Sequence, residues 1–185
     1  PKPQTPNPNP LIPIFKALIV KVIRLIKPIN LGSRYGKESF ALITGATSGI
    51  GLAFTNYLIR EGFNIFAISR DNIKLENLKQ ELLSKFPNRK VLIMVKDFSQ
   101  SNKHDFFKDI ESEFNLIDVS ILINNIGICY TDPDSNDSNP NQKLAPVFDQ
   151  IQANITTAVC LTRIITPSMI KRGSGCIVNV GSIAS

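Results

Sequence analysis

The stretch Thr44-Gly45-Ala46-Thr47-Ser48-Gly49-Ile50-Gly51 decides the fold class of this chain. The apolar run Phe40–Ile43 precedes it, and an amphipathic stretch, Leu52–Glu61, follows it. Proteins often hold a nucleotide phosphate in a glycine-rich turn between a buried strand and a helix, because the helix N-terminus offers unpaired N–H groups and a partial positive charge. The turn therefore predicts a nucleotide-binding α/β fold, with an ordinary structural turn as the alternative.

The three glycines of this turn have separate functions in such a site. Gly45 permits a sharp exit from the strand, Gly49 clears space for a pyrophosphate, and Gly51 lets helix and strand pack closely. Their spacing is G-x-x-x-G-x-G, which differs from the G-x-G-x-x-G fingerprint of many dinucleotide folds. We expect the whole cradle to bind the phosphates, that is Gly45, Thr47, Ser48, Gly49, Ile50 and Gly51.

Apolar runs and helical patterns alternate along the rest of the chain. This alternation predicts βαβ units and a parallel sheet, because buried parallel strands read as continuous apolar runs. We therefore expect a Rossmann-like, doubly wound parallel sheet that stops after its fifth strand. The predicted strands are Phe40–Ile43, Asn64–Ile68, Val91–Val95, Val119–Ile123 and Cys176–Val180, and the helices after the first are Ile73–Phe86, Asn102–Phe114 and Val147–Arg172.

Length and charge separate the chain into a basic N-terminal part and one domain. The 185 residues carry a net charge of +6, but residues 1–37 contain seven basic residues and no acid. The remainder has 14 basic and 15 acidic residues, or −1. A nucleic-acid-binding protein would need basic residues across the face of its domain, so we expect no nucleic-acid partner. The three cysteines and the single His104 lack metal-ligand spacing, and no metal site is predicted.

The N-terminal part divides into a tail and a helix. Residues 1–10 are rich in proline and asparagine and predict a disordered tail. Residues 11–30 predict an amphipathic helix with an apolar face opposite a lysine and arginine face. Its charges argue against a transmembrane span and favour a helix in a membrane interface. Docking on its own domain or on a partner protein is the alternative. The nucleotide-binding domain then covers 38–185.

Residues at the ends of the later strands complete the predicted cofactor site. Arg70 follows the second strand, where an arginine accommodates the 2′-phosphate of NADP(H), although a solvated arginine at a helix start is the alternative. Asp97 and Phe98 follow the third strand, where the carboxylate could hold the adenine or cap the next turn. Asn124 and Gly127 follow the fourth strand and should line the cofactor crevice.

Taken in order, these segments resemble the short-chain dehydrogenase/reductase family. The resemblance rests on TGATSGIG at 44–51, Asp97, NNIG at 124–127, Asn154 and IVNVGSIAS at 177–185. The basic N-terminal segment, SRDNIKLENLKQEL at 69–82 and VKDFS at 95–99 are similar to one branch. That branch holds the membrane-associated 17β-hydroxysteroid dehydrogenase type 12 and the very-long-chain 3-oxoacyl-CoA reductases.

The resemblance implies an NADP(H)-dependent oxidoreductase that acts on a lipid-like ketone, either a 3-oxoacyl thioester or a steroid. Ser182 would bond the substrate oxygen, and Asn154 would help to hold a water in a proton relay. The helix at 147–172 would pack against another subunit. The resemblance also implies an intracellular, membrane-associated protein, with the endoplasmic reticulum favoured over the mitochondrial membrane.

The family's catalytic Tyr-x-x-x-Lys motif is missing from the sequence. The three tyrosines are Tyr35, Tyr57 and Tyr130, and the residues four positions on are Ser39, Glu61 and Asp134. Since the general acid needs a phenol beside a cation, we expect these 185 residues alone to transfer hydride poorly. Either the protein continues beyond Ser185, which we favour, or it is a catalytically inactive accessory subunit of a membrane-associated complex.

Overall fold

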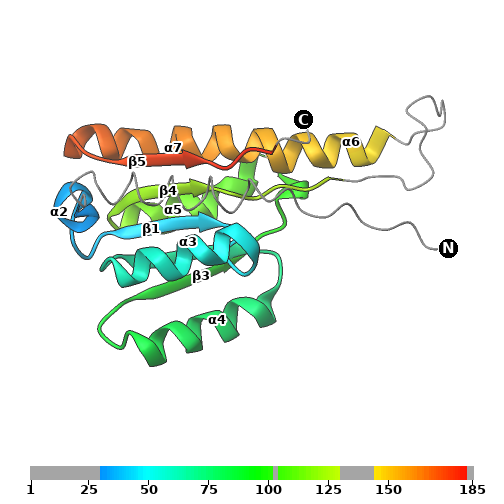
Figure 1. Cartoon of the computed structure of the whole chain (residues 1–185). Coiled ribbons are helices and arrows are strands. Elements are labelled where there is room, and N and C mark those ends of the chain that lie inside the picture. Colours follow the sequence, from blue (N-terminus) through cyan, green and yellow to red (C-terminus); the bar gives the residue numbers. More distant parts are fainter. Residues whose placement is uncertain (1–29, 102–103, 130–143, 183–185) are drawn as a thin grey trace, which may run out of the picture. The chain divides into compact units, whose positions relative to one another are not determined.

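The computed structural model describes residues 30–101, 104–129 and 144–182. Its centre is a parallel sheet of five strands in the order β3-β2-β1-β4-β5 (Figure 1). The predicted α/β fold with a Rossmann-like parallel sheet is confirmed. The strands are β1 (Phe40–Thr44), β2 (Asn64–Ser69), β3 (Val91–Val95), β4 (Val119–Asn124) and β5 (Cys176–Asn179).

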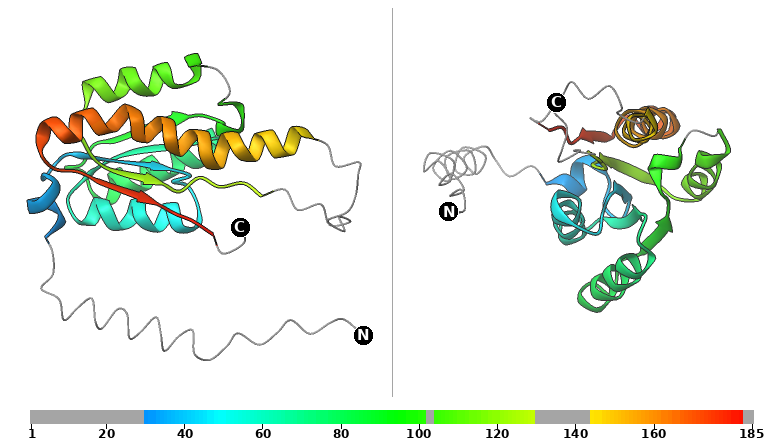
Figure 2. Two further views of the ribbon diagram at one scale, coloured as in Figure 1. Left: turned by 90° about the horizontal axis from the view of Figure 1, so that it is seen from above. Right: turned by 90° about the vertical axis from the view of Figure 1, so that its right-hand side faces the viewer.

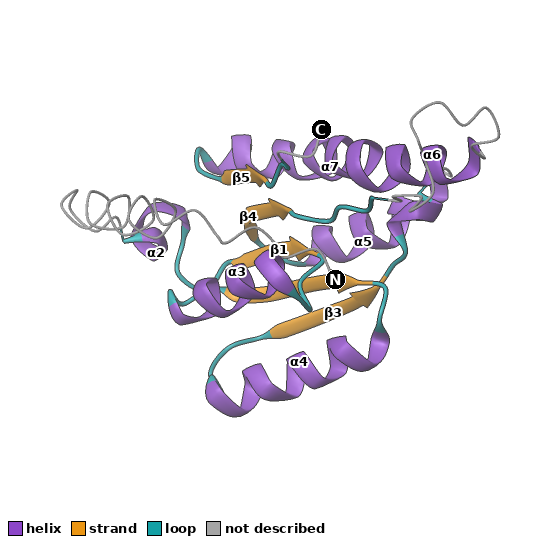
Figure 3. Ribbon diagram, turned by 45° about the vertical axis from the view of Figure 1, so that its right-hand side comes forward, coloured by secondary structure: helices purple, strands orange, loops and turns teal. Residues whose placement is uncertain are grey.

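Helices cover both faces of the sheet. Figures 2 and 3 show α3 (Gly49–Arg60) and α4 (Asn72–Lys85) on one face, and α5 (Lys108–Leu116) and α7 (Thr157–Arg172) on the other. The strand order runs outward from β1 to β3 and restarts at β4 on the opposite side of β1. Ligands of such sheets bind at the carboxyl ends of the strands beside this reversal, which here is the edge after β1 and β4.

The apolar runs form strands because both of their faces are buried. In β1, Phe40 and Leu42 belong to a core cluster that includes Ile110 of α5 and Leu161 of α7. The alternate residues of β1 point to the other face, since successive side chains of a strand alternate, and they are equally buried. Burial on both sides explains why the sequence shows no alternation of polar and apolar residues in these strands.

The helices differ from the sequence prediction at their ends. Helix α3 begins at Gly49, within the glycine motif, and not at Leu52. The predicted helix Val147–Arg172 is three segments: α6 (Leu144–Ile151), a π-helical turn η3 (Gln152–Thr156) and α7. The predicted helix Asn102–Phe114 is a 3-10 turn, η2 (His104–Phe107), followed by α5. Two elements were not predicted, namely α2 (Leu31–Tyr35) and the 3-10 turn η1 (Phe98–Gln100).

The predicted tail over 1–10 lies outside the described residues, as does the predicted helix over 11–30 apart from Asn30. The chain from Gly32 onward forms one compact unit. Within the part of the chain that the structure describes, no helix has the length and apolar character needed to cross a membrane.

Candidate functional site

The glycine turn between β1 and α3 leaves a backbone cradle. Gly45 has φ +65° and Gly49 has φ +53°, backbone conformations that favour glycine. A methyl group at Gly51 would lie 2.5 Å from Asn125 Nδ2 and closer still to the Gly45 carbonyl oxygen. Gly51 therefore lets the start of α3 pack directly against the turn after β1, and the N-terminus of a helix placed in this way offers main-chain N–H groups to an anion. The cradle therefore fits the phosphates of a dinucleotide.

Two polar residues fix this turn against the end of β4. Asn125 Nδ2 donates to the Thr44 carbonyl oxygen at 3.0 Å. The Thr44 hydroxyl oxygen accepts from the main-chain N–H groups of Asn125 at 3.0 Å and Ile126 at 3.1 Å. Because these bonds join the two strands on either side of the topological reversal, they set the width of the crevice between them.

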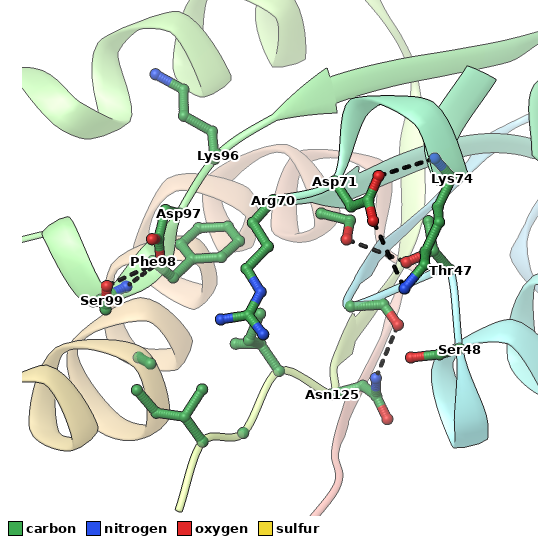
Figure 4. Close-up of a pocket in the computed structure, with 16 residues that line it drawn as sticks. Thr47, Ser48, Arg70, Asp71, Lys74, Lys96, Asp97, Phe98, Ser99 and Asn125 are labelled. Atoms are coloured by element: carbon green, nitrogen blue, oxygen red, sulfur yellow. Dashed lines mark hydrogen bonds and ion pairs between the residues drawn. The ribbon is translucent and has the colours of Figure 1, made fainter. Parts of the chain in front are cut away.

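A cavity of about 380 Å³ opens beside the glycine turn (Figure 4). Its walls come from the ends of β1 to β4 and from the first turn of α4, and Figure 4 shows the Arg70 side chain reaching across it. The predicted residues Gly45, Thr47, Ser48, Arg70, Asp97, Phe98 and Gly127 all line it. The fold thus brings the first part of the predicted phosphate cradle and Arg70 into one cavity, whereas the predicted residues Gly49 and Gly51 line neither this cavity nor the second one that adjoins it.

The charged side chains that line this cavity differ in the hydrogen bonds and ion pairs that they form. Among the described residues, Arg70 has no hydrogen bond or ion pair. Asp71 caps α4 by accepting from the main-chain N–H of Lys74 at 3.0 Å, and this bond lowers the pKa of the Asp71 carboxyl. Lys96 donates to Asp109 at 2.6 Å, and this bond lowers the pKa of Asp109. Arg70 is therefore the cation best able to meet an anionic ligand.

Asp97 and Phe98 take structural roles at the cavity wall. The Asp97 carboxylate caps η1, accepting from the N–H of Ser99 at 3.1 Å and from its hydroxyl at 2.9 Å. The Phe98 side chain is 1% exposed and belongs to the core. Asp97 thus does what the capping alternative predicted, while it still lines the cavity.

A second cavity, of about 660 Å³, adjoins the first along residues 125–128. It is lined by both residues predicted to be catalytic, Ser182 and Asn154, and by Ile50 of the glycine motif. Asn154 lies in the π-helical turn η3, and its side chain forms two bonds with the main chain of Ile128. Its oxygen accepts from the Ile128 N–H at 2.8 Å, and its nitrogen donates to the carbonyl at 2.9 Å.

Asn124, which we expected in the cofactor crevice, lines neither cavity. Its buried side chain donates to Asn179 Oδ1 at 2.9 Å and to Thr162 Oγ1 at 3.3 Å. The next residue, Asn125, lines both cavities instead. The dipeptide in the sequence signals an asparagine at the site, and because consecutive residues of a strand point in opposite directions, only Asn125 reaches the cavities.

Comparison with known proteins agrees with the family resemblance that the sequence motifs indicate. The family model described as short chain dehydrogenase matches residues 39–185. A very-long-chain 3-oxoacyl-CoA reductase of Caenorhabditis briggsae is 37% identical over 180 residues, which cover 95% of this chain and 54% of the relative. Putative steroid dehydrogenase 2 of Caenorhabditis elegans is 37% identical over 158 residues, covering 85% of this chain and 49% of the relative.

Among solved structures, a short-chain dehydrogenase from Sphingobium yanoikuyae in complex with NADPH has a TM-score of 0.68 and 26% identity. The match covers 78% of this chain and 54% of that one. The chain spans about half the length of the curated relatives it matches.

Proposed function

The chain belongs to the short-chain dehydrogenase family, and on this premise we propose that it functions in an NADP(H)-dependent oxidoreductase that acts on a lipid-like ketone. The observation that carries the proposal is the cavity that Arg70 lines together with Gly45, Thr47 and Ser48 of the glycine turn, with no hydrogen bond or ion pair from Arg70 to another described residue. A guanidinium forms charge-assisted, forked bonds with phosphate. When bound, NADPH supplies the hydride that reduces a ketone.

The cofactor is held by groups of this chain with separate tasks. The cradle at residues 45–51 binds the pyrophosphate through its main-chain N–H groups, and Arg70 binds the 2′-phosphate. Asp97 lines the cavity, and its carboxylate would hold the adenine there. The similar Sphingobium enzyme was solved with NADPH, which supports the choice of NADP(H) over NAD(H).

The second cavity suits a carbonyl on an apolar molecule. Isoleucine and valine side chains (Ile50, Ile126, Ile128 and Val180) line it, together with the polar groups of Ser182 and Asn154. The names of the similar proteins, a 3-oxoacyl-CoA reductase and a putative steroid dehydrogenase, support a 3-oxoacyl thioester or a steroid as the substrate.

We assign catalytic roles to Ser182 and Asn154. The Ser182 hydroxyl bonds the substrate oxygen and orients the carbonyl. Asn154 holds the Ile128 main chain at the junction of the two cavities, where it would help to hold the water of the proton relay. No Tyr-x-x-x-Lys motif occurs in the sequence, so no residue here is assigned as the general acid.

We also propose that the protein associates with membranes and with a second subunit. Residues 11–30 would lie on the membrane, with the endoplasmic reticulum preferred.

Apolar side chains on α6, η3 and α7, namely Phe148, Ile155 and Val159, are more than half exposed and would be covered by another copy of the chain. The similar proteins named above are a reductase and a dehydrogenase, and nothing favours the accessory-subunit alternative.

Titration with NADPH and NADH, followed by nucleotide fluorescence, tests the cofactor assignment. We expect the unchanged chain to prefer NADPH, and Arg70→Ala to lose about tenfold or more in NADPH affinity, as fits a charge-assisted phosphate contact. Binding of NADH should stay unchanged. Arg60→Ala is the matched control, because Arg60 is exposed but lines neither cavity. An NADPH preference that survives in Arg70→Ala contradicts the assignment.

A further inference from the structure

The cavity beside the glycine turn contains a second cation that the sequence did not single out. Lys74 lies in the first turn of α4, and its side chain lines the cavity together with Arg70. We infer that Lys74 binds the 2′-phosphate of the cofactor alongside Arg70 and determines the preference for NADP(H). This inference rests on the proposed NADP(H) site.

Figure 4 shows the two cations entering from different elements, Arg70 from the end of β2 and Lys74 from α4. The Asp71 carboxylate lies between them in the sequence and pairs with the Lys74 ammonium. Lys74 Nζ lies on the side of the cavity where Thr47 of the glycine turn lies. A phosphate on the ribose, held between the cradle and Arg70, would therefore lie within reach of both cations.

The ion pair of Lys74 is loose enough to be exchanged for a phosphate. Its Nζ lies 3.5 Å from Asp71 Oδ2, and the two side chains are 64% and 39% exposed. Exposed ion pairs of this kind contribute little to stability. By contrast, Lys96, the third lysine or arginine of the cavity, is 16% exposed and is fixed to Asp109 at 2.6 Å and to the Phe106 carbonyl at 3.2 Å. Lys74 is thus the available lysine.

The net charge at this end of the cavity becomes positive only when Lys74 is counted with Arg70. Arg70 and Asp71 alone sum to zero, and Lys74 raises the sum to +1. An acid just after the second strand is also the group that binds the ribose hydroxyls of NAD in this kind of fold. Without Lys74, the Asp71 carboxylate would repel a 2′-phosphate and accept a ribose hydroxyl. The lysine therefore offsets the Asp71 carboxylate, so that Arg70 and Lys74 together favour a 2′-phosphate over a ribose hydroxyl.

The test uses two nucleotides that differ in the 2′-phosphate alone, adenosine 2′,5′-bisphosphate and adenosine 5′-monophosphate. Their affinities for the full chain and its variants are measured by calorimetry. We expect Lys74→Met to weaken the bisphosphate about tenfold, the size of one charge-assisted bond to a partly exposed phosphate. Binding of the monophosphate should not fall. Lys74→Arg should keep most of the preference, since it retains the charge.

Lys85→Met provides the matched control. Lys85 lies on the same helix and also forms an exposed ion pair, with Glu81 at 2.5 Å, but it does not line the cavity. Lys74→Met leaves the helix cap intact, because Asp71 accepts from the main-chain N–H of residue 74, so the melting temperature should change little. The Lys85 variant should bind both nucleotides as the unchanged chain does.

Two negative results of this experiment would have different meanings. If the unchanged chain prefers the bisphosphate and Lys74→Met keeps that preference in full, the inference about Lys74 is overturned and the NADP(H) site stands. If the unchanged chain shows no preference for the bisphosphate, the proposed function itself is wrong. A loss of equal size for both nucleotides in Lys74→Met also overturns the inference, because the lysine would then act on a part that they share.

Discussion

At the level of single residues, the shape of the candidate site depends on the hydroxyl group of Thr44. Thr44 is fully buried, and its hydroxyl donates to the Ile123 carbonyl at 3.3 Å while accepting from two main-chain N–H groups. Those N–H groups belong to Asn125 and Ile126, which line both cavities. One side chain therefore holds the wall that the two cavities share.

Replacing Thr44 by valine keeps the shape and removes the hydroxyl. Because two buried N–H groups then lose their acceptor, we expect Thr44→Val to lower the free energy of unfolding by about 2–3 kcal/mol, measured by urea denaturation. Thr44→Ser is the control, since it retains the hydroxyl and loses only a methyl group. NADPH affinity should fall in the valine variant. A valine variant as stable as the serine variant would mean that the N–H groups find other partners.

At the level of helices, the π-helical turn η3 divides one long predicted helix into parts with different tasks. The Gln152 carbonyl accepts from the hydroxyls of Ser101 at 3.2 Å and Thr157 at 2.9 Å. The Ser101 bond anchors the turn to the residue that follows η1, and Asn154 of the same turn lines the second cavity. Beyond the turn, α7 buries Leu161 and Ile165 against the sheet, so its opposite side carries the exposed apolar residues.

The exposed side of α7 gives a prediction about assembly. Val159 is 63% exposed, and Val159→Glu should prevent the proposed contact with a second copy, because an acid would be buried without a partner. Sedimentation velocity should then show a smaller species than the unchanged chain. Ile73→Glu is the control, since Ile73 is 74% exposed but lies on α4. Identical sedimentation of all three proteins would exclude this surface as an interface.

Across the whole chain, the net positive charge comes from the first 37 residues, which carry +7, while the remainder carries a net charge of −1. A cluster of basic residues interleaved with apolar ones attracts anionic lipids, whereas a near-neutral domain does not. We therefore expect membrane binding by the basic segment to be separable from nucleotide binding by the domain.

Deletion of residues 1–29 tests this separation. We expect the shortened chain to leave the membrane fraction and to stop binding vesicles that contain anionic lipid, as judged by flotation. NADPH affinity and the melting temperature should stay unchanged, since the cradle and Arg70 lie in the unit that begins at Gly32. Continued flotation of the shortened chain would assign membrane binding to the domain instead.

Most of the fold could be read from the sequence because it depends on local patterns. Buried parallel strands need continuous apolar runs, and all five runs became strands with ends within one residue of those expected. The glycine motif and Arg70 were found for the same reason, since each occupies a fixed place relative to a strand end. Helix ends were less accurate, because the start of α3 and the π-helical turn depend on contacts with other elements.

The local sequence was sufficient to specify the strands, the glycine cradle and Arg70, because backbone conformation and burial pattern are properties of short segments. The assignment of Asn125, and not Asn124, to the cavities required the packing of β4 between β1 and β5. The same is true of Lys74, which lines the cavity beside the glycine turn only because α4 packs next to the ends of β1 and β2. Distances between segments that are remote in the sequence arise only when the sheet assembles, and the chemistry of the site depends on those distances.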